Sequence, residues 1–359
     1  MTIPTWPPGP GPTLRPDLAK LPSYVPGRKT PGAVVLASNE SPYGLLPGIA
    51  ELLADVAHGA SRYPDMSAAT LLAALADHHG VTPDRVAVGA GSVEVLGQLV
   101  SATVAAGDDV VFAWRAFEAY PIVTAVAGGN AVRVPLTDGH VHDVDAMVDA
   151  LTERTRVVLV CNPNNPTSTA VGEKDLRRVV DAVPDDVLVV VDEAYREYVD
   201  PDLVPDAFEL FGDRPNVAVL RTFSKAYGLA GLRVGYCLAA PELVRVARTC
   251  QVPFSVSALA QAAAVSALGQ QEEVARRARA TVAERGRVTD ELRQLGLGVP
   301  DSAANFVWLP LGDGSTGFAE HCAGRGVLVR PFTGEGVRVT IGLPEENDAF
   351  LAAVASRQE

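Results

Sequence analysis

Short apolar runs alternate with helix-like stretches between residues 84 and 240, and this alternation constrains the fold more than any other feature. Several runs are almost continuous valine and leucine, as in strands that helices cover on both faces. The pattern indicates βαβ units and a mainly parallel sheet. The predicted strands are 85–88, 109–113, 131–135, 157–161, 187–191, 217–221 and 233–238, and the predicted crossover helices are 93–105, 120–127 and 173–183.

The pattern changes beyond Pro241 to longer helices and predicts a smaller α+β domain. A helix over 271–295 would carry one apolar stripe, made by Val274, Ala278, Val282, Val288 and Leu292. The arginines of this helix alternate with glutamates, which favours a solvated face over a binding site. We therefore expect an α/β protein with an N-terminal arm (1–38) associated with the small domain, a large domain (39–245) and a small C-terminal domain (246–359).

Composition limits the classes of partner. The 359 residues are 48% hydrophobic, which is enough for a large core with a smaller domain attached. A net charge of -13 argues against a nucleic-acid surface or an anionic membrane as partner, because both need basic patches. No apolar run approaches the roughly 20 residues of a membrane span, and residues 1–12 do not resemble a signal peptide.

Four cysteines stand at positions 161, 237, 250 and 322 without a Cys-x-x-Cys pair or metal-ligand spacing. Such spacing favours free thiols in a reducing compartment, so we expect a cytoplasmic protein without a metal site.

The stretch from Arg221 to Arg233, RTFSKAYGLAGLR, follows a predicted buried strand and places Lys225 among hydroxyls and a second cation. Partial desolvation and a nearby cation lower the pKa of a lysine and make it a nucleophile toward aldehydes. Arg233 and the hydroxyls of Thr222 and Ser224 could hold a phosphate. A Ser-Lys pair in a loop is by itself usually no more than a loop.

A second apolar strand ends in Asp192-Glu-Ala-Tyr195. A carboxylate there lies at the rim where parallel sheets bind ligands. Asp192 could pair with a protonated pyridine nitrogen, and Tyr195 could donate to a phenolate-like oxygen. The structural alternatives are a helix cap for Asp192 and a packed ring for Tyr195.

Two turns add possible ligand contacts. The sequence CNPNNPT at 161–167 forms an irregular turn in which Asn165 could bond a ring substituent. The sequence VGAGS at 88–92 opens a helix, whose free backbone N–H groups could receive a phosphate. This glycine turn is a weak signal by itself and lacks the full G-x-G-x-x-G spacing.

In this order and on successive strand ends, these residues resemble the fold type I pyridoxal-phosphate aminotransferases, in the branch of histidinol-phosphate and aromatic aminotransferases. The resemblance covers nearly the whole chain. It begins at LASNESPYG (36–44), continues through RYPD (62–65) and ends at GVRVTIG (336–342).

The resemblance implies pyridoxal 5'-phosphate as cofactor, with Lys225 as the lysine that holds it as a Schiff base. Asp192 would be the partner of the pyridine nitrogen, Tyr195 and Asn165 those of the ring hydroxyl oxygen, and Phe117 would stack on the ring. The phosphate would be held by Gly91, Ser92, Thr222, Ser224 and Arg233, joined by Tyr63 from a second subunit. A homodimer with shared active sites follows.

The resemblance also implies a substrate end of the site. Arg338 would clamp the substrate carboxylate through its guanidinium fork. Arg330 would be a second substrate-facing cation, with a surface ion pair as the alternative. Asn39 would contribute to substrate binding, and Tyr24 would cover the substrate or, equally, be a packing aromatic.

Two positions depart from the pattern of the family. Ser168 stands where the family usually has glycine, so a positive φ there would carry a strain of about 1 kcal/mol. Ala90 stands where the aromatic branch often has asparagine, which weakens the match of the phosphate loop.

The substrate implied by the resemblance is an aromatic amino acid. Stretches 112–121, 252–256 and 305–309 look more like the actinobacterial aromatic amino acid aminotransferases than the histidine-pathway enzyme. The expected reaction moves the amino group of phenylalanine or tyrosine, with tryptophan as a further candidate, to 2-oxoglutarate in a ping-pong cycle.

Other readings stay open. Histidinol phosphate is the alternative substrate, because Arg330, Arg28 and Lys29 could bind its phosphate. A decarboxylase or β-lyase need not keep the carboxylate clamp, so Arg338 favours transamination. A regulatory module would need an attached DNA-binding region, for which the segment before Asn39 is too short and rich in proline.

Overall fold

The computed structural model describes residues 13–19, 21 and 30–357. Its large sheet has seven strands in the order β2-β8-β7-β6-β5-β3-β4. They are β2 (Val86–Gly89), β3 (Asp109–Trp114), β4 (Asn130–Pro135), β5 (Thr155–Cys161), β6 (Leu188–Asp192), β7 (Val217–Thr222) and β8 (Gly235–Leu238). Among these strands, β8 pairs antiparallel with both β2 and β7, and all other pairs are parallel, so the predicted mainly parallel sheet is confirmed.

Helices cover both faces of this sheet because alternate side chains of each strand point to opposite faces. On one face, α4 (Ser92–Thr103), α5 (Ala119–Ala127) and α9 (Pro241–Thr249) pack with strand residues such as Val157 and Leu159. On the other, α6 (Val144–Asp149), α7 (Glu173–Ala182) and α8 (Ala207–Phe211) pack with residues such as Val158 and Val160. This double burial explains the nearly unbroken valine and leucine of the strands.

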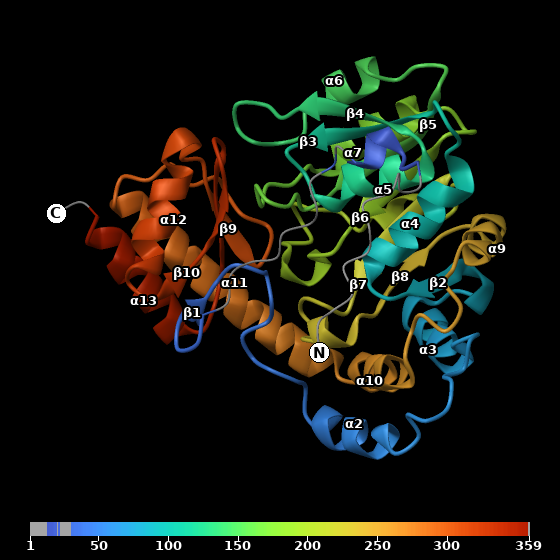
Figure 1. Cartoon of the computed structure of the whole chain (residues 1–359), viewed down its shortest axis with the longest axis horizontal. Helices are drawn as coiled ribbons and strands as arrows, with labels where there is room; N and C mark the ends of the chain where they lie inside the picture. The colour runs from blue at the N-terminus through green and yellow to red at the C-terminus, as the bar shows by residue number, and fades with distance from the viewer. Residues whose placement is uncertain (1–12, 20, 22–29, 358–359) are drawn as a thin grey trace, which may run out of the picture.

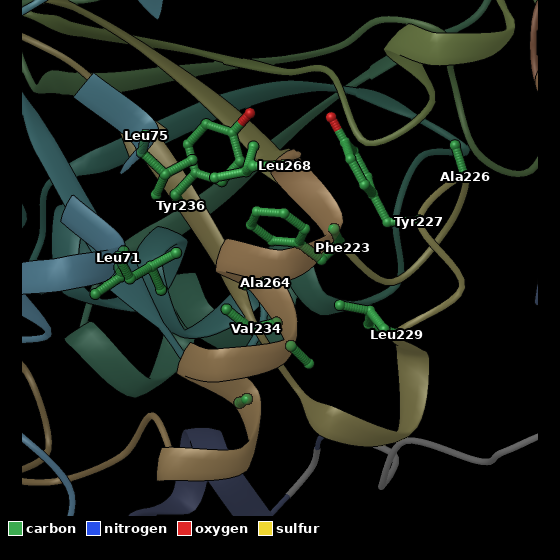
Figure 2. Close-up of a cluster of buried hydrophobic side chains, with 14 of the residues drawn as sticks. Leu71, Leu75, Phe223, Ala226, Tyr227, Leu229, Val234, Tyr236, Ala264 and Leu268 are labelled. Atoms are coloured by element: carbon green, nitrogen blue, oxygen red, sulfur yellow. The ribbon is translucent and has the colours of Figure 1, made fainter. Parts of the chain in front are cut away.

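A third apolar cluster lies where α3 (Ala69–His79) and α10 (Ala258–Leu268) meet the antiparallel end of the sheet. Figure 2 shows Leu71 and Leu75 facing Phe223, Tyr236 and the α10 side chains. The helix α2 (Ile49–Ala57) also contacts α10. Because α10 packs on large-domain helices, we propose that the domain division falls within the next helix rather than at residue 245.

That next helix, α11 (Gln271–Gln294), runs from the large domain to the small one (Figure 1). The small domain holds an antiparallel sheet in the order β11-β12-β9, with α12 and α13 packed nearby. Its elements are β9 (Phe306–Leu309), α12 (Ser315–Ala323), β10 (Val327–Leu328), β11 (Arg330–Phe332), β12 (Gly336–Thr340) and α13 (Pro344–Ala355).

The N-terminal segment contacts both domains. Strand β1 (Val34–Val35) pairs parallel with β10 of the small domain. The short helix α1 (Pro16–Ala19) lies near α5, where the Arg15 guanidinium donates to the carbonyls of Ala125 and Val126 at 2.7 and 3.0 Å. Short 3-10 helices complete the fold: η1 (Pro83–Arg85), η2 (Arg196–Tyr198), η3 (Ala230–Leu232) and η4 (Gly312–Gly314).

The arginines of α11 differ from the predicted solvated face. Arg277 is buried, pairs with Glu273 at 2.8 Å, and donates to the carbonyls of Gly44 and Leu45 at 3.0 and 3.2 Å. Arg285 donates to the carbonyls of Tyr198 and Ala304. The prediction was wrong for these two residues because α11 passes close to turns whose carbonyls need donors.

Three further observations concern the part of the chain that the structure describes. None of the described helices combines the length and the apolar character needed to cross a bilayer. Among the described residues, no cluster of three or more histidine, cysteine or acidic side chains could hold a metal ion. The four cysteines are free thiols, of which Cys250 is exposed and the others are buried.

Candidate active site

A cavity of about 500 Å³ opens at the carboxyl ends of β5, β6 and β7. This is the edge at which open parallel sheets bind ligands. The cavity wall also includes residues 37–39, the start of α4, part of α5 and two arginines of the small domain. Most of the predicted site residues line it: Asn39, Ser92, Phe117, Asn165, Asp192, Tyr195, Thr222, Ser224, Lys225, Arg233, Arg330 and Arg338.

Lys225 reaches the cavity because its neighbours are anchored in the core. Phe223, Tyr227 and Leu229 lie in the apolar cluster of Figure 2, which holds the loop after β7 from behind. The Nζ atom of Lys225 lies 3.4 Å from the carbonyl oxygen of Ser38. Burial, assisted by the charge of Arg338, lowers the pKa of this amine from 10.5 to about 7. An amine with that pKa is largely uncharged just above neutral pH and can act as a nucleophile.

Asp192 ends β6 as a buried carboxylate with one oxygen engaged and one free of hydrogen bonds. Its Oδ2 accepts from the hydroxyl of Tyr120 at 3.0 Å. Its Oδ1 is buried and has no hydrogen-bond partner among the described residues. Burial raises the pKa of Asp192 to about 6. An orphaned acceptor beside a cavity fits a cationic N–H donor, such as a protonated pyridine nitrogen.

The amide and phenol groups near Asp192 come from separate segments. The side chain of Asn39 donates to the hydroxyl of Tyr195 at 3.0 Å, and its backbone N–H donates to Thr340 at 2.9 Å. The Oδ1 atom of Asn165 accepts from Arg338 at 2.6 Å. The ring of Tyr195 also packs edge-on against Phe306, with centroids 5.1 Å apart. Tyr195 thus combines the packing role with a position on the cavity wall.

A glycine turn and a loop arginine form a cradle at the start of α4. Gly91 has φ 84°, and a Cβ added there would lie 2.5 Å from Nη2 of Arg233. The backbone N–H groups of the first helical turn and this guanidinium suit an anion. Ser224 lies beside them, with its Oγ 3.4 Å from Nη1 of Arg233 and its N–H donating to Thr222. Gly91 therefore leaves room for the Arg233 guanidinium and does not itself line the cavity.

Two arginines from the small domain face the other end of the cavity. Arg338, on β12, donates from Nη2 to the carbonyl of Ala37 at 2.8 Å as well as to Asn165. Arg330, on β11, donates to Glu118 at 3.1 Å, and only 15% of its side chain is exposed. Arg330 therefore lines the cavity and is also ion-paired, and its role toward a substrate stays a prediction. A second ion pair between the domains joins Arg115 and Glu335.

The wall that α5 contributes was missed by the sequence analysis. Ala119, Ile122 and Val123 line the cavity beside Phe117. Their spacing places them on one face of the helix, and it was visible in the sequence as an ordinary core stripe. Cys161 and Ala194 also line the cavity, and Tyr120 bonds Asp192 from behind. A buried tyrosine inside a predicted helix carries no sequence signal of that contact.

One described residue of the predicted site, Tyr63, lies away from the cavity. Tyr63 is 82% exposed, and its ring stacks on Phe254 with centroids 4.6 Å apart, outside the cavity of its own chain. Tyr24 lies outside the described residues, as do Arg28 and Lys29.

Ser168, where the family usually has glycine, has the positive φ that the sequence analysis considered, at 62°. The residue is buried, and its hydroxyl donates to the carbonyl of Thr167 at 2.6 Å. A local hydrogen bond of this kind helps a short polar side chain to occupy the left-handed region.

The sequence and the fold match known proteins along nearly the whole chain. An "Aromatic amino acid aminotransferase" of Rhodococcus jostii is 54% identical over 97% of this chain and 96% of its own. The protein of the same name from Streptomyces coelicolor is 53% identical over 95% and 96% of the two chains. A histidinol-phosphate aminotransferase from Sinorhizobium meliloti, solved in complex with pyridoxal-5'-phosphate, superposes with a TM-score of 0.86 at 30% identity, covering 96% of each chain.

The sequence model of one family, described as Aminotransferase class I and II, matches residues 31–354. The match includes every described strand and every described residue of the cavity wall. The chain therefore belongs to the class I and II aminotransferases.

Proposed function

We propose that this chain is an aromatic amino acid aminotransferase that binds pyridoxal 5'-phosphate through Lys225. The observation that carries the proposal is a buried lysine of lowered pKa in one cavity with a buried carboxylate that has an unused oxygen. Relatives called aromatic amino acid aminotransferases, 52–54% identical, support the substrate class.

The described residues fit this cofactor at each of its functional groups. Lys225 would bind the aldehyde carbon, and Oδ1 of Asp192 would accept from the ring nitrogen. Tyr195 and Asn165 would contact the ring hydroxyl oxygen, while Phe117 would stack on the ring. Ser92, Thr222, Ser224 and Arg233 would hold the phosphate at the positive end of α4, with Gly91 leaving room for Arg233.

When bound, pyridoxal phosphate supplies an electron sink that stabilises negative charge at the substrate α-carbon. Asp192 would keep the ring nitrogen protonated, because the negative charge of a nearby carboxylate favours the charged form of a base. Lys225, as a free amine, would move the α-proton of the substrate, for which an amine of pKa about 7 is well matched at neutral pH. Arg338 orients the substrate by binding its carboxylate in a two-pronged contact.

The substrate side chain would lie against α5. Ile122, Val123 and Phe117 give this wall an apolar surface, which favours an aromatic ring over a phosphorylated group. The nearby cation, Arg330, has its charge balanced by Glu118 at 3.1 Å. A phosphate ester would have to compete with that carboxylate. Asn39 would contact the substrate from the N-terminal segment.

Several finer points belong to the same proposal. The amino group acceptor is 2-oxoglutarate, and the cycle is ping-pong. The protein is a homodimer in which the exposed Tyr63 reaches the phosphate site of the partner. Its free thiols favour the cytoplasm.

Borohydride trapping tests the cofactor assignment. Protein incubated with pyridoxal phosphate, reduced and digested should carry the adduct on Lys225. The chain has four lysines, Lys20, Lys29, Lys174 and Lys225, so peptide mass spectrometry can assign the adduct to one residue. Lys174→Arg is the control and should retain it, whereas Lys225→Arg should lose it. An adduct elsewhere, or none, would refute the proposal.

A substrate panel tests the specificity. Phenylalanine, tyrosine and histidinol phosphate are each supplied with 2-oxoglutarate, and glutamate formation is measured. We expect the larger kcat/KM for the two aromatic amino acids. A preference for histidinol phosphate would replace the substrate assignment while leaving the cofactor assignment intact.

A further inference from the structure

Tyr120 is the one side chain that the described structure places in hydrogen-bond contact with the carboxylate of Asp192. Its hydroxyl donates to Oδ2 at 3.0 Å across 72 positions of sequence. Tyr120 is 1% exposed and is absent from the cavity wall, so it cannot touch a bound molecule directly. Its influence on the site must therefore pass through the cavity residues that it contacts, Asp192 by a hydrogen bond and Phe117 by ring packing.

The position of the Tyr120 ring is fixed by its surroundings. The ring packs edge-on against Phe112 and Phe117, with centroids 5.7 and 5.8 Å apart. Its backbone N–H donates to the carbonyl of Phe117, and its carbonyl accepts from the hydroxyl of Thr124 at 2.8 Å. A phenol held on both sides presents its O–H in one direction.

The two oxygens of Asp192 are thereby made unequal. A carboxylate on a strand end can rotate about its terminal torsion and exchange its two oxygens. The bond from Tyr120 keeps one of them, Oδ2, turned toward α5. The other, Oδ1, is buried and makes no hydrogen bond with the described residues by distance and angle.

We infer that Tyr120 is a positioning residue that holds Asp192 so that Oδ1 is the oxygen left to bind the ring nitrogen of the cofactor. The inference rests on the proposed function, because it needs a ring nitrogen in the cavity. The inference gives α5 two roles. Its face with Ile122 and Val123 borders the cavity, and Tyr120 fixes the orientation of the Asp192 carboxylate.

A double-mutant cycle tests this assignment. Cofactor-free protein is titrated with pyridoxal phosphate, and the dissociation constant is measured from tryptophan fluorescence for the wild type, Tyr120→Phe, Asp192→Asn and the double variant. Tyr120→Phe should weaken binding about tenfold, as expected for one hydrogen bond to a charged group. In the Asp192→Asn background the same change should have an effect of less than about twofold, because the two residues act as a unit.

Matched variants separate positioning from general damage. Tyr236→Phe removes another buried phenol hydroxyl, bonded to His79 at 2.9 Å, and should leave the dissociation constant unchanged. If Tyr120→Phe does not fold, Tyr120→His keeps an N–H donor in a smaller ring. It should bind the cofactor within about threefold of the wild type, since the donor is retained.

The outcomes distinguish this inference from the proposed function. No binding by the wild type, or binding unaffected by Lys225→Arg and Asp192→Asn, would overturn the proposed function itself. Binding that Asp192→Asn weakens but Tyr120→Phe does not would overturn the role of Tyr120 alone. Equal losses from Tyr120→Phe in both Asp192 backgrounds would also overturn it, because the tyrosine would then act only on packing.

Discussion

Replacing Arg221 by methionine should destabilise the protein strongly, although the methionine side chain fills most of the space that the arginine occupied. Arg221 is buried on β7, directly before Thr222. Its guanidinium donates to Oε2 of Glu193 at 2.8 and 3.1 Å and to Oδ2 of Asp206 at 2.7 Å. Glu193 is 2% exposed and follows Asp192, so this network joins the ends of the two strands that carry the site.

The size of the expected stability loss follows from the Glu193 charge that stays buried when Arg221 is removed. Asp206 keeps a second cation, Arg196, at 3.6 Å, but among the described residues the Glu193 carboxylate keeps only the backbone N–H of Ala207 as a donor. Removing one partner of a buried ion pair costs about 3–5 kcal/mol of the free energy of unfolding, because the remaining charge is not compensated. Removing that charge as well, in Arg221→Met with Glu193→Gln, should recover most of the loss.

The pH dependence of the stability loss in Arg221→Met gives an independent check on this explanation. Burial raises the pKa of Glu193 above its ordinary value even with Arg221 present, and losing the arginine raises it further. A carboxyl whose pKa is higher in the folded than in the unfolded protein destabilises the fold most above its folded pKa. The penalty disappears below the unfolded pKa, where both states are protonated. The loss in Arg221→Met should therefore be larger at pH 8 than at pH 5.

Urea unfolding followed by far-ultraviolet circular dichroism measures both effects. Arg245→Met is the matched control, because Arg245 makes an exposed pair with Glu242 and should show no measurable change in midpoint. A loss below about 1 kcal/mol in Arg221→Met, or no recovery with Glu193→Gln, would show that the network does not carry a buried charge.

Three further predictions concern the site. Because the pKa of Lys225 is lowered to about 7, its uncharged fraction and its rate of borohydride-trapped reaction with pyridoxal phosphate should rise about tenfold from pH 6 to pH 8; a flat profile would contradict the lowered pKa. Arg338→Lys loses the guanidinium fork and should raise KM for phenylalanine at least about tenfold, with cofactor affinity unchanged as the control measurement. Gly91→Ala combines a strained φ with a Cβ 2.5 Å from Arg233, so it should weaken pyridoxal phosphate binding, measured by fluorescence titration, more than Gly97→Ala, which meets nothing within 4 Å.

The sequence was sufficient for the sheet and for the residues at its edge. Valine-rich runs mark the seven strands, and because most are parallel their carboxyl ends converge, which brings Lys225, Asp192 and Asn165 to one cavity. The start of β8 was predicted at residue 233, but Arg233 has φ 57° and the strand begins at Gly235. An arginine in that conformation turns out of the strand.

Contacts between distant segments could not be predicted from local patterns. Tyr120 looks like any aromatic in an apolar helix, and only the packing of α5 over the end of β6 gives its hydroxyl a partner. Arg277 lies among glutamates at helical spacing, which is typical of a solvated face. It is nevertheless buried, because carbonyls of the turn at residues 43–45 accept hydrogen bonds from its guanidinium. In both cases the hydrogen-bond acceptor is far away in the sequence.

The hydrogen bonds of Asn39 connect the small domain to Tyr195, and this has a consequence for domain movement. Its backbone and side chain are bonded to Thr340, and its carbonyl accepts from Asn305, so it travels with the small domain. The same residue donates to the phenol of Tyr195, which follows β6 of the large domain. A hinge movement that opens the two domains must lengthen or break the hydrogen bond between Asn39 and Tyr195. The hydrogen bonding of the Tyr195 phenol therefore reports the angle between the two domains.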